Sequence, residues 1–168
     1  PSLTKYAWLS IGAAVVTIGI KFSAYIVTGS VGLLSDALEG IVNLIAAIIV
    51  LITLRVVEQP PDEIHQYGHD KAEYFSSGIE GTLIVIAALS ILYTSVQRLL
   101  NPQPLEQVGL GLILALVASG INFFVGQLLI RTGKKHESIA VEADGQHLMS
   151  DVWTSVGVVI GISIAVLT

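Results

Sequence analysis

Residues 31–57 read VGLLSDALEGIVNLIAAIIVLITLRVV, and this almost continuously apolar run indicates a membrane-spanning helix. About 20 apolar residues in helical form cross the roughly 30 Å hydrocarbon core of a bilayer. The run does not alternate between polar and apolar residues, as a membrane-spanning strand would. It nevertheless contains Asp36, Glu39 and Asn43. Such groups are costly at membrane depth, so they require an explanation.

Similar apolar stretches occur on both sides of this run. Together the five predicted spans cover residues 6–27, 31–57, 74–100, 107–130 and 139–168. The predicted fold class is therefore all-α, a polytopic transmembrane helical bundle. The composition agrees with this, because 53% of the residues are hydrophobic and only 12% are charged. An average soluble domain carries about 25% charged residues.

The distribution of basic residues predicts the orientation of the bundle, since Lys and Arg are enriched in cytoplasmic connectors. If the N-terminus is cytoplasmic, most of the basic residues fall on the cytoplasmic side. These are Lys5, Arg55, Lys71, Arg131, Lys134 and Lys135. Arg98 falls on the other side, and Lys21 lies within the first span, from which we expect it to reach the nearer interface. We therefore expect an integral membrane protein with a cytoplasmic N-terminus, in the cell membrane if the chain is bacterial.

Several function classes are excluded by what the sequence lacks. The chain contains no Cys, so it has no disulfide, no thiolate nucleophile and no iron–sulfur ligation. Its net charge is −5 without a basic patch, which argues against nucleic acid as a partner. It contains no H-E-x-x-H motif, so an intramembrane metalloprotease is not expected. We predict that the chain is not an enzyme.

Two spans carry polar residues at the same spacing. The second span reads D-x-x-E-x-x-x-N and the fifth reads D-x-x-H-x-x-x-D. The residues are Asp36, Glu39, Asn43, Asp144, His147 and Asp151. Positions i, i+3 and i+7 lie on one face of a helix, so each span presents three polar groups in one direction.

Paired ligands at i and i+4 can hold one cation between them. Glu39 with Asn43 and His147 with Asp151 would supply four ligands, the number that a tetrahedral divalent site needs. The two carboxylates would neutralise a divalent ion. We therefore predict a metal site formed by these four residues. Asp36 and Asp144 are either outer ligands or groups that position the helices.

Simpler interpretations of the polar residues remain open. Polar side chains can hold helices together by hydrogen bonds alone, as in a structural membrane protein. The same acids would also suit a proton or cation channel. Glu80 is isolated in the third span, where it either lines the path or hydrogen-bonds a neighbour.

The connector between the second and third spans repeats the pattern of metal-binding residues. It contains Asp62, His65 and His69, and imidazole with carboxylate suits zinc and its neighbours in the first transition row. We predict a second, cytoplasmic site here. The alternative is a solvated surface loop.

These segments resemble the cation diffusion facilitator family of proton-coupled exporters of divalent metals. TGSVGLLSDALEGIVNL (28–44) and EADGQHLMSD (142–151) are similar to the second and fifth spans of the family, which supply the transport site. QPPDEIHQYGHDKAE (59–73) is similar to the connector that precedes the third span, including the [FY]-G-H-x-[KR]-x-E signature. The three segments occur in the order that the family has.

The resemblance implies a homodimer whose subunits have six spans and a cytoplasmic C-terminal domain. We therefore expect residues 1–168 to be the cation efflux transmembrane domain without its sixth span. The implied partners are a divalent metal ion, protons and the lipid bilayer, with no prosthetic group. Zn²⁺ is expected first, and Mn²⁺, Fe²⁺ or Co²⁺ are alternatives because the site has one nitrogen and three oxygen ligands. In some members the positions of Asp62, His65 and His69 bind a second ion that is not transported.

Overall fold

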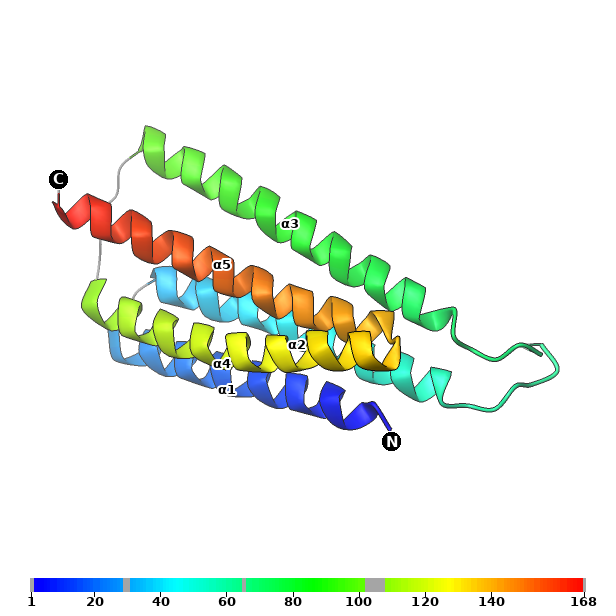
Figure 1. The fold of residues 1–168 in the computed structure, drawn as a ribbon. Helices are drawn as coiled ribbons and strands as arrows, with labels where there is room; N and C mark the ends of the chain where they lie inside the picture. The colour runs from blue at the N-terminus through cyan, green and yellow to red at the C-terminus, as the bar shows by residue number, and fades with distance from the viewer. Residues whose placement is uncertain (1, 29–30, 65, 102–107, 168) are drawn as a thin grey trace.

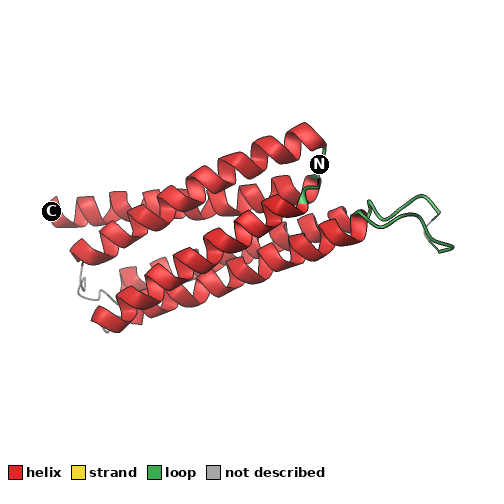
Figure 2. Cartoon of the chain, turned by 90° about the horizontal axis from the view of Figure 1, so that it is seen from below, coloured by secondary structure: helices red, strands yellow, loops and turns green. Residues whose placement is uncertain are grey.

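The computed structural model describes residues 2–28, 31–64, 66–101 and 108–167. Within these ranges the protein forms five long helices and no strand (Figures 1 and 2). The helices are α1 (Thr4–Thr28), α2 (Val31–Val57), α3 (Ala72–Leu100), α4 (Val108–His136) and α5 (Ile139–Leu167). The expected all-α bundle is confirmed.

Four of these helices are long and apolar enough to cross a membrane. Their candidate spans are Thr4–Val27, Asp36–Val57, Ala72–Gln97 and Gly109–His136. Among the residues that the structure describes, no such span is found in α5, the fifth predicted span. The protein is a multi-pass membrane protein.

The helices pack as two close pairs with α3 at the edge. The pairs are α1 with α2 and α4 with α5, and α3 contacts α5 and α2 (Figure 1). Only 6% of the span Ala72–Gln97 in α3 is buried, against 39% of Asp36–Val57 in α2. The N-terminus lies at the same end of the bundle as the connector between α2 and α3 (Figure 1). We call this the N-terminal end.

The α4–α5 pair is held at close range by glycines. A Cβ atom at Gly145 would lie 2.8 Å from the backbone nitrogen of Ile130 and 2.9 Å from the carbonyl oxygen of Gly126. A Cβ atom at Gly133 would lie 2.5 Å from the nitrogen of Glu142. Because backbone approaches backbone at these points, a side chain at either glycine would separate the two helices.

The fourth helix extends beyond its predicted end. Residues 131–138 were expected to form a charged connector, but α4 continues to His136. Arg and Lys are good helix formers, and at a helix C-terminus they interact favourably with the helix dipole. The helix ends where Glu137 adopts a left-handed conformation (φ 56°) and the Ser138 N–H bonds back to the Gly133 carbonyl. The connector is therefore only two residues long.

The start of α5 is capped by a residue from another helix. The Glu73 carboxylate of α3 accepts hydrogen bonds from the Ser138 hydroxyl (2.9 Å) and the Ala140 N–H (3.0 Å). The first N–H groups of a helix have no partner within it, and a negative charge there is favourable. Glu73 thus fixes α3 to α5 at the N-terminal end.

A cluster of buried apolar side chains closes the N-terminal end of the bundle. It comes from the start of α1, the end of α2, the end of α4 and the start of α5. Its members are Ala7, Val50, Leu51, Leu54, Leu129, Ala140, Val141 and Leu148. We refer to these residues as the apolar cluster.

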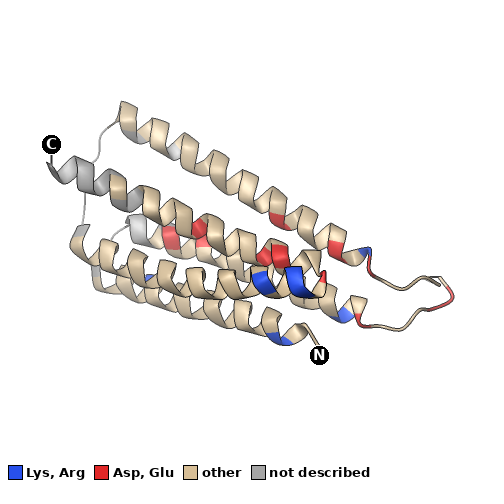
Figure 3. Ribbon diagram, in the orientation of Figure 1, with Lys and Arg blue, Asp and Glu red and all other residues tan. Residues whose placement is uncertain are grey.

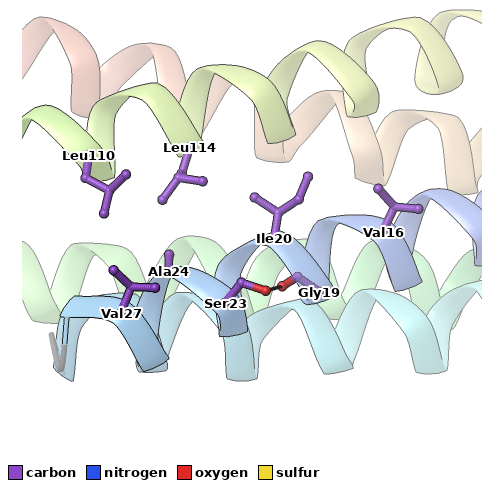
Figure 4. Close-up of a pocket in the computed structure, with 8 residues that line it drawn as sticks. All are labelled: Val16, Gly19, Ile20, Ser23, Ala24, Val27, Leu110 and Leu114. Carbon is purple, nitrogen blue, oxygen red and sulfur yellow. Dashed lines mark hydrogen bonds between the residues drawn. The ribbon is translucent and has the colours of Figure 1, made fainter.

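An apolar groove of about 550 Å³ lies between α1 and α4 on the outer surface (Figure 4). Its lining includes Val16, Ile20, Leu110 and Leu114. The Ser23 hydroxyl in this groove donates to the Gly19 carbonyl of its own helix (2.7 Å). The groove is therefore suited to hydrocarbon and offers no ligand set for a cation.

Candidate metal centre

Three of the four predicted ligands meet in the middle of the bundle. The Asn43 side chain of α2 lies between two residues of α5. Its Oδ1 is 2.9 Å from Nε2 of His147, and its Nδ2 donates to Oδ2 of Asp151. The two polar stripes of equal spacing thus meet at the same level of the bundle. There Asn43 of α2 joins His147 and Asp151, the i and i+4 residues of α5.

Glu80 of α3 contacts the opposite side of the same imidazole. Its Oε2 lies 2.9 Å from Nδ1 of His147. Glu80 is completely buried (0% exposed), and His147 is 5% exposed. Of the two sequence interpretations of Glu80, the structure supports hydrogen bonding to a neighbour, because Glu80 is not among the residues that line the adjacent cavity.

The direction of these hydrogen bonds shows where protons lie. The Asn43 Nδ2 faces Asp151, which leaves the amide oxygen facing His147. An amide oxygen only accepts, so Nε2 of His147 carries a proton and donates it to Asn43. A cation that binds to Nε2 must therefore displace a proton.

A cavity of about 310 Å³ lies beside this network. Residues of all five helices line it. They include Lys21 of α1, Asp36 and Glu39 of α2, Ser90 of α3, Asn122 of α4, and Thr154 of α5. The cavity is also bordered by Asn43, His147 and Asp151. The network therefore faces a space that is larger than a single ion.

The cavity extends from the network away from the N-terminal end. Along α5 its lining begins at His147 and continues to Ser155, and along α2 it reaches Asp36, near the start of that helix. The side chain of Asp36 is 43% exposed. The apolar cluster lies on the other side of the network. The cavity therefore lies on the side of the network that faces away from the apolar cluster.

Glu39, the fourth predicted ligand, lines this cavity, and within the described part of the chain it forms no hydrogen bond to the other three. It interacts electrostatically with Asp151 and with Lys21. The structure thus brings three of the four residues together directly and places the fourth on the same cavity wall. Within the described part of the chain, no group of three or more His, Asp or Glu residues is close enough to form a metal cluster.

Lys21 has a different role from the one expected. It does not simply extend towards the membrane interface, because its ammonium group forms an ion pair with Asp36 at 3.1 Å. Both residues line the cavity. Within apolar surroundings a paired charge is far less costly than a free one. Asp36 therefore balances the charge of Lys21 of α1. It lies beside the network of Asn43, His147 and Asp151 and is not part of it.

Asp144 lies outside the cavity. Its side chain is buried (3% exposed) and forms a hydrogen bond with Ser10 of α1. It is also close enough to Glu80 and His147 to interact with them electrostatically. This placement favours the helix-positioning interpretation of Asp144 over that of an outer ligand.

The connector between α2 and α3 extends beyond the end of the bundle (Figure 1). Of the three residues predicted to bind a cytoplasmic ion, Asp62 and His69 lie 3.4 Å apart, from Oδ2 to Nε2. His65 lies outside the described residues. Gly68 between them has φ 87°, a left-handed conformation that glycine adopts without strain. The carboxylate and one imidazole are therefore already adjacent.

Basic and acidic residues are distributed differently along the bundle (Figure 3). Lys and Arg gather at the N-terminal end, whereas Asp and Glu also occur in the middle of the helices (Figure 3). The arrangement agrees with the basic-residue pattern of the sequence. Few basic side chains of the protein therefore lie near the acidic groups in the middle of the bundle.

Comparison with known proteins gives a consistent result. Residues 7–168 match the family of the cation efflux transmembrane domain. An uncharacterized transporter of Synechocystis sp. is 55% identical over 163 residues, covering 97% of this chain and 53% of that protein. The cation-efflux pump FieF of Shewanella oneidensis is 31% identical over 153 residues (91% and 52%), and that of Klebsiella pneumoniae subsp. pneumoniae is 31% identical over 146 residues (87% and 49%). The chain spans about half the length of the curated relatives it matches.

Proposed function

Because the chain belongs to the cation efflux transmembrane domain family, we propose that it forms the membrane pathway of a divalent metal exporter driven by proton exchange. The cation would leave the cytoplasm and a proton would return. The observation that carries this proposal is the network of Asn43, His147 and Asp151, in which groups from two helices meet beside a cavity.

The chemistry of these groups supports a divalent cation as cargo. Glu39 and Asp151 would supply two negative charges, while Asn43 and neutral His147 would add neutral ligands. A divalent ion would then be balanced in surroundings of low dielectric. Zn²⁺ is the first expectation because it accepts four nitrogen and oxygen ligands. Mn²⁺, Fe²⁺ and Co²⁺ are alternatives because three of the four ligands are oxygens.

Proton exchange is supported by the hydrogen bond between His147 and Asn43. Nε2 of His147 is the atom that would bind the metal, and in this arrangement it donates a proton. Metal and proton therefore compete for one lone pair. A proton that reaches His147 from the outer side would release the metal there. Histidine suits this exchange because its ordinary pKa is about 6.5.

The shape of the bundle supports alternating access. The cavity extends from the network towards one end, and the apolar cluster separates the network from the N-terminal end. With the N-terminus in the cytoplasm, this shape corresponds to a conformation open outward. Loading from the cytoplasm would require the helices to rock apart around the apolar cluster.

Three further features of the proposal come from the family and the sequence. The N-terminus is cytoplasmic, in accordance with the basic residues at that end of the bundle (Figure 3). Asp62, His65 and His69 bind a second ion that is not transported. The working unit is a homodimer in the membrane, the cell membrane if the chain is bacterial.

The proposal is tested by metal uptake into inverted vesicles that contain the full-length protein and carry an imposed pH gradient. Each of the variants H147A and D151A should reduce uptake at least tenfold, because each removes a ligand in contact with Asn43. E142Q is the matched control, since Glu142 is an acidic residue of α5 whose carboxylate pairs with Lys134 at 3.8 Å, away from the cavity.

The alternatives predict different results. A channel would pass cations without proton countertransport. If the chain had only a structural role, variants of Glu39 or His147 would leave metal uptake into the vesicles unchanged. Normal uptake in both H147A and D151A, with the proteins folded, would contradict the assignment of the site.

A further inference from the structure

We propose that Glu80 is a positioning residue for the metal site, which holds the ring of His147 so that Nε2 faces the cation. The inference rests on the proposed function of His147 as a ligand. It concerns a residue of α3, whereas the predicted ligands belong to α2 and α5.

The contact itself is short and completely enclosed. Glu80 Oε2 lies 2.9 Å from His147 Nδ1, and the two side chains are 1% and 6% exposed. A carboxylate in such a position requires a partner, because an isolated buried charge is very costly. Among the described residues, His147 is the only hydrogen-bond partner of the Glu80 side chain, and Oε1 of Glu80 has no partner. The contact with the imidazole is therefore the main polar interaction of Glu80.

The two nitrogens of His147 face different surroundings. Nδ1 is directed to Glu80, which does not line the cavity, while Nε2 is directed to Asn43, which does. A histidine that binds a metal through one nitrogen commonly donates the N–H of the other to a carboxylate. This second hydrogen bond fixes both the tautomer and the rotation of the ring. Glu80 thus determines that Nε2 is the ligating atom.

The position of Glu80 also links the site to the edge helix. α3 is the most exposed of the four candidate spans, and Glu80 is one of the few residues of α3 that are buried. A hydrogen bond that served only to attach α3 would stabilise the protein without affecting metal affinity. The two roles are therefore separable by experiment.

The test compares Zn²⁺ affinity of the full-length protein with that of E80L and E80Q. E80L removes every acceptor for Nδ1–H, so affinity should fall about 10- to 100-fold. E80Q keeps an acceptor oxygen and should remain within a few-fold of the wild type. S76A is the matched control, because Ser76 is a buried polar residue one turn earlier in α3 that does not contact His147. H147A in the same titration establishes whether His147 is a ligand at all.

A second measurement does not depend on the folding of E80L. With ¹⁵N-labelled histidine in the zinc-loaded wild-type protein, the resonances absent from H147A identify His147. Its Nδ1 should be protonated and its Nε2 bound to metal. Zinc on Nδ1, or wild-type affinity in folded E80L, would overturn the inference alone. If the wild type binds none of Zn²⁺, Mn²⁺, Fe²⁺ and Co²⁺, or H147A binds the metal equally well, the proposed function fails and the inference fails with it.

Discussion

At the scale of single residues, the site combines hydrogen bonds that leave little freedom of orientation. Asn43 can donate to Asp151 only through its amide nitrogen, so its oxygen must face His147. Glu80 then holds the other nitrogen of the ring. Each of these contacts joins two helices, and together they fix the orientation of the His147 ring.

The ion pair between Lys21 and Asp36 leads to a prediction about charge in the cavity. K21M leaves Asp36 as an uncompensated carboxylate, so metal affinity should rise about tenfold and release should slow, because opposite charges attract strongly in low dielectric. D36N leaves Lys21 near Glu39 and Asp151, so affinity should fall by a similar factor.

Metal titration of the two variants and of K21M/D36N forms a double-mutant cycle. The double variant removes both charges and should return close to wild-type affinity. Equal affinity in all four proteins would contradict the view that Lys21 balances the charge of the cavity.

At the scale of helices, length and apolar composition were sufficient to predict all five helices. A long apolar run such as residues 31–57 can form few stable structures other than a helix. Of the residues paired by the i and i+4 spacing, Asn43 of α2 contacts His147 and Asp151 of α5, whereas Glu39 only lines the adjacent cavity. Contacts between helices were less predictable. The partner of Glu80 depends on the rotation of α3 about its axis, and sequence spacing within one helix says nothing about that rotation.

The ends of helices were the other limit of prediction. The basic residues 131–136 were expected in a connector, yet they continue α4 because charged residues at a helix end also remain in water. Glu73 was noted only as part of a motif. Its function as a cap for α5 depends on the position of another helix end, which only the structure supplies.

The close α4–α5 contact predicts opposite effects for two similar substitutions. G145A places a methyl group 2.8 Å from a backbone nitrogen, so it should destabilise the protein by about 1–3 kcal/mol. G157A in the same helix meets nothing within 4 Å. There, alanine should stabilise the helix by about 0.5–1 kcal/mol.

The measurement is the apparent unfolding temperature of both variants in the same detergent. G145A should unfold below the wild type and G157A at or above it. A G145A protein as stable as G157A would show that α4 and α5 are not packed as closely as described.

At the scale of the whole molecule, a polar network lies between an apolar cluster at the N-terminal end and a cavity that extends the other way. The two sides of the network thus differ, since one is packed with apolar side chains and the other borders the cavity. Binding of a cation at the network would be linked to every protonation equilibrium that it disturbs. If metal displaces a proton from the site, the number of protons released into the buffer on metal binding measures this exchange.

The measurement that tests the central claim most directly is the number of protons released for each metal ion bound. Calorimetric titration of the full-length protein with Zn²⁺, in buffers of different ionisation enthalpy, counts these protons. We predict a saturable site that releases about one proton from His147, with affinity that falls as the pH is lowered. Metal binding without proton release, or with the same release in H147A, would contradict the proposed exchange at Nε2.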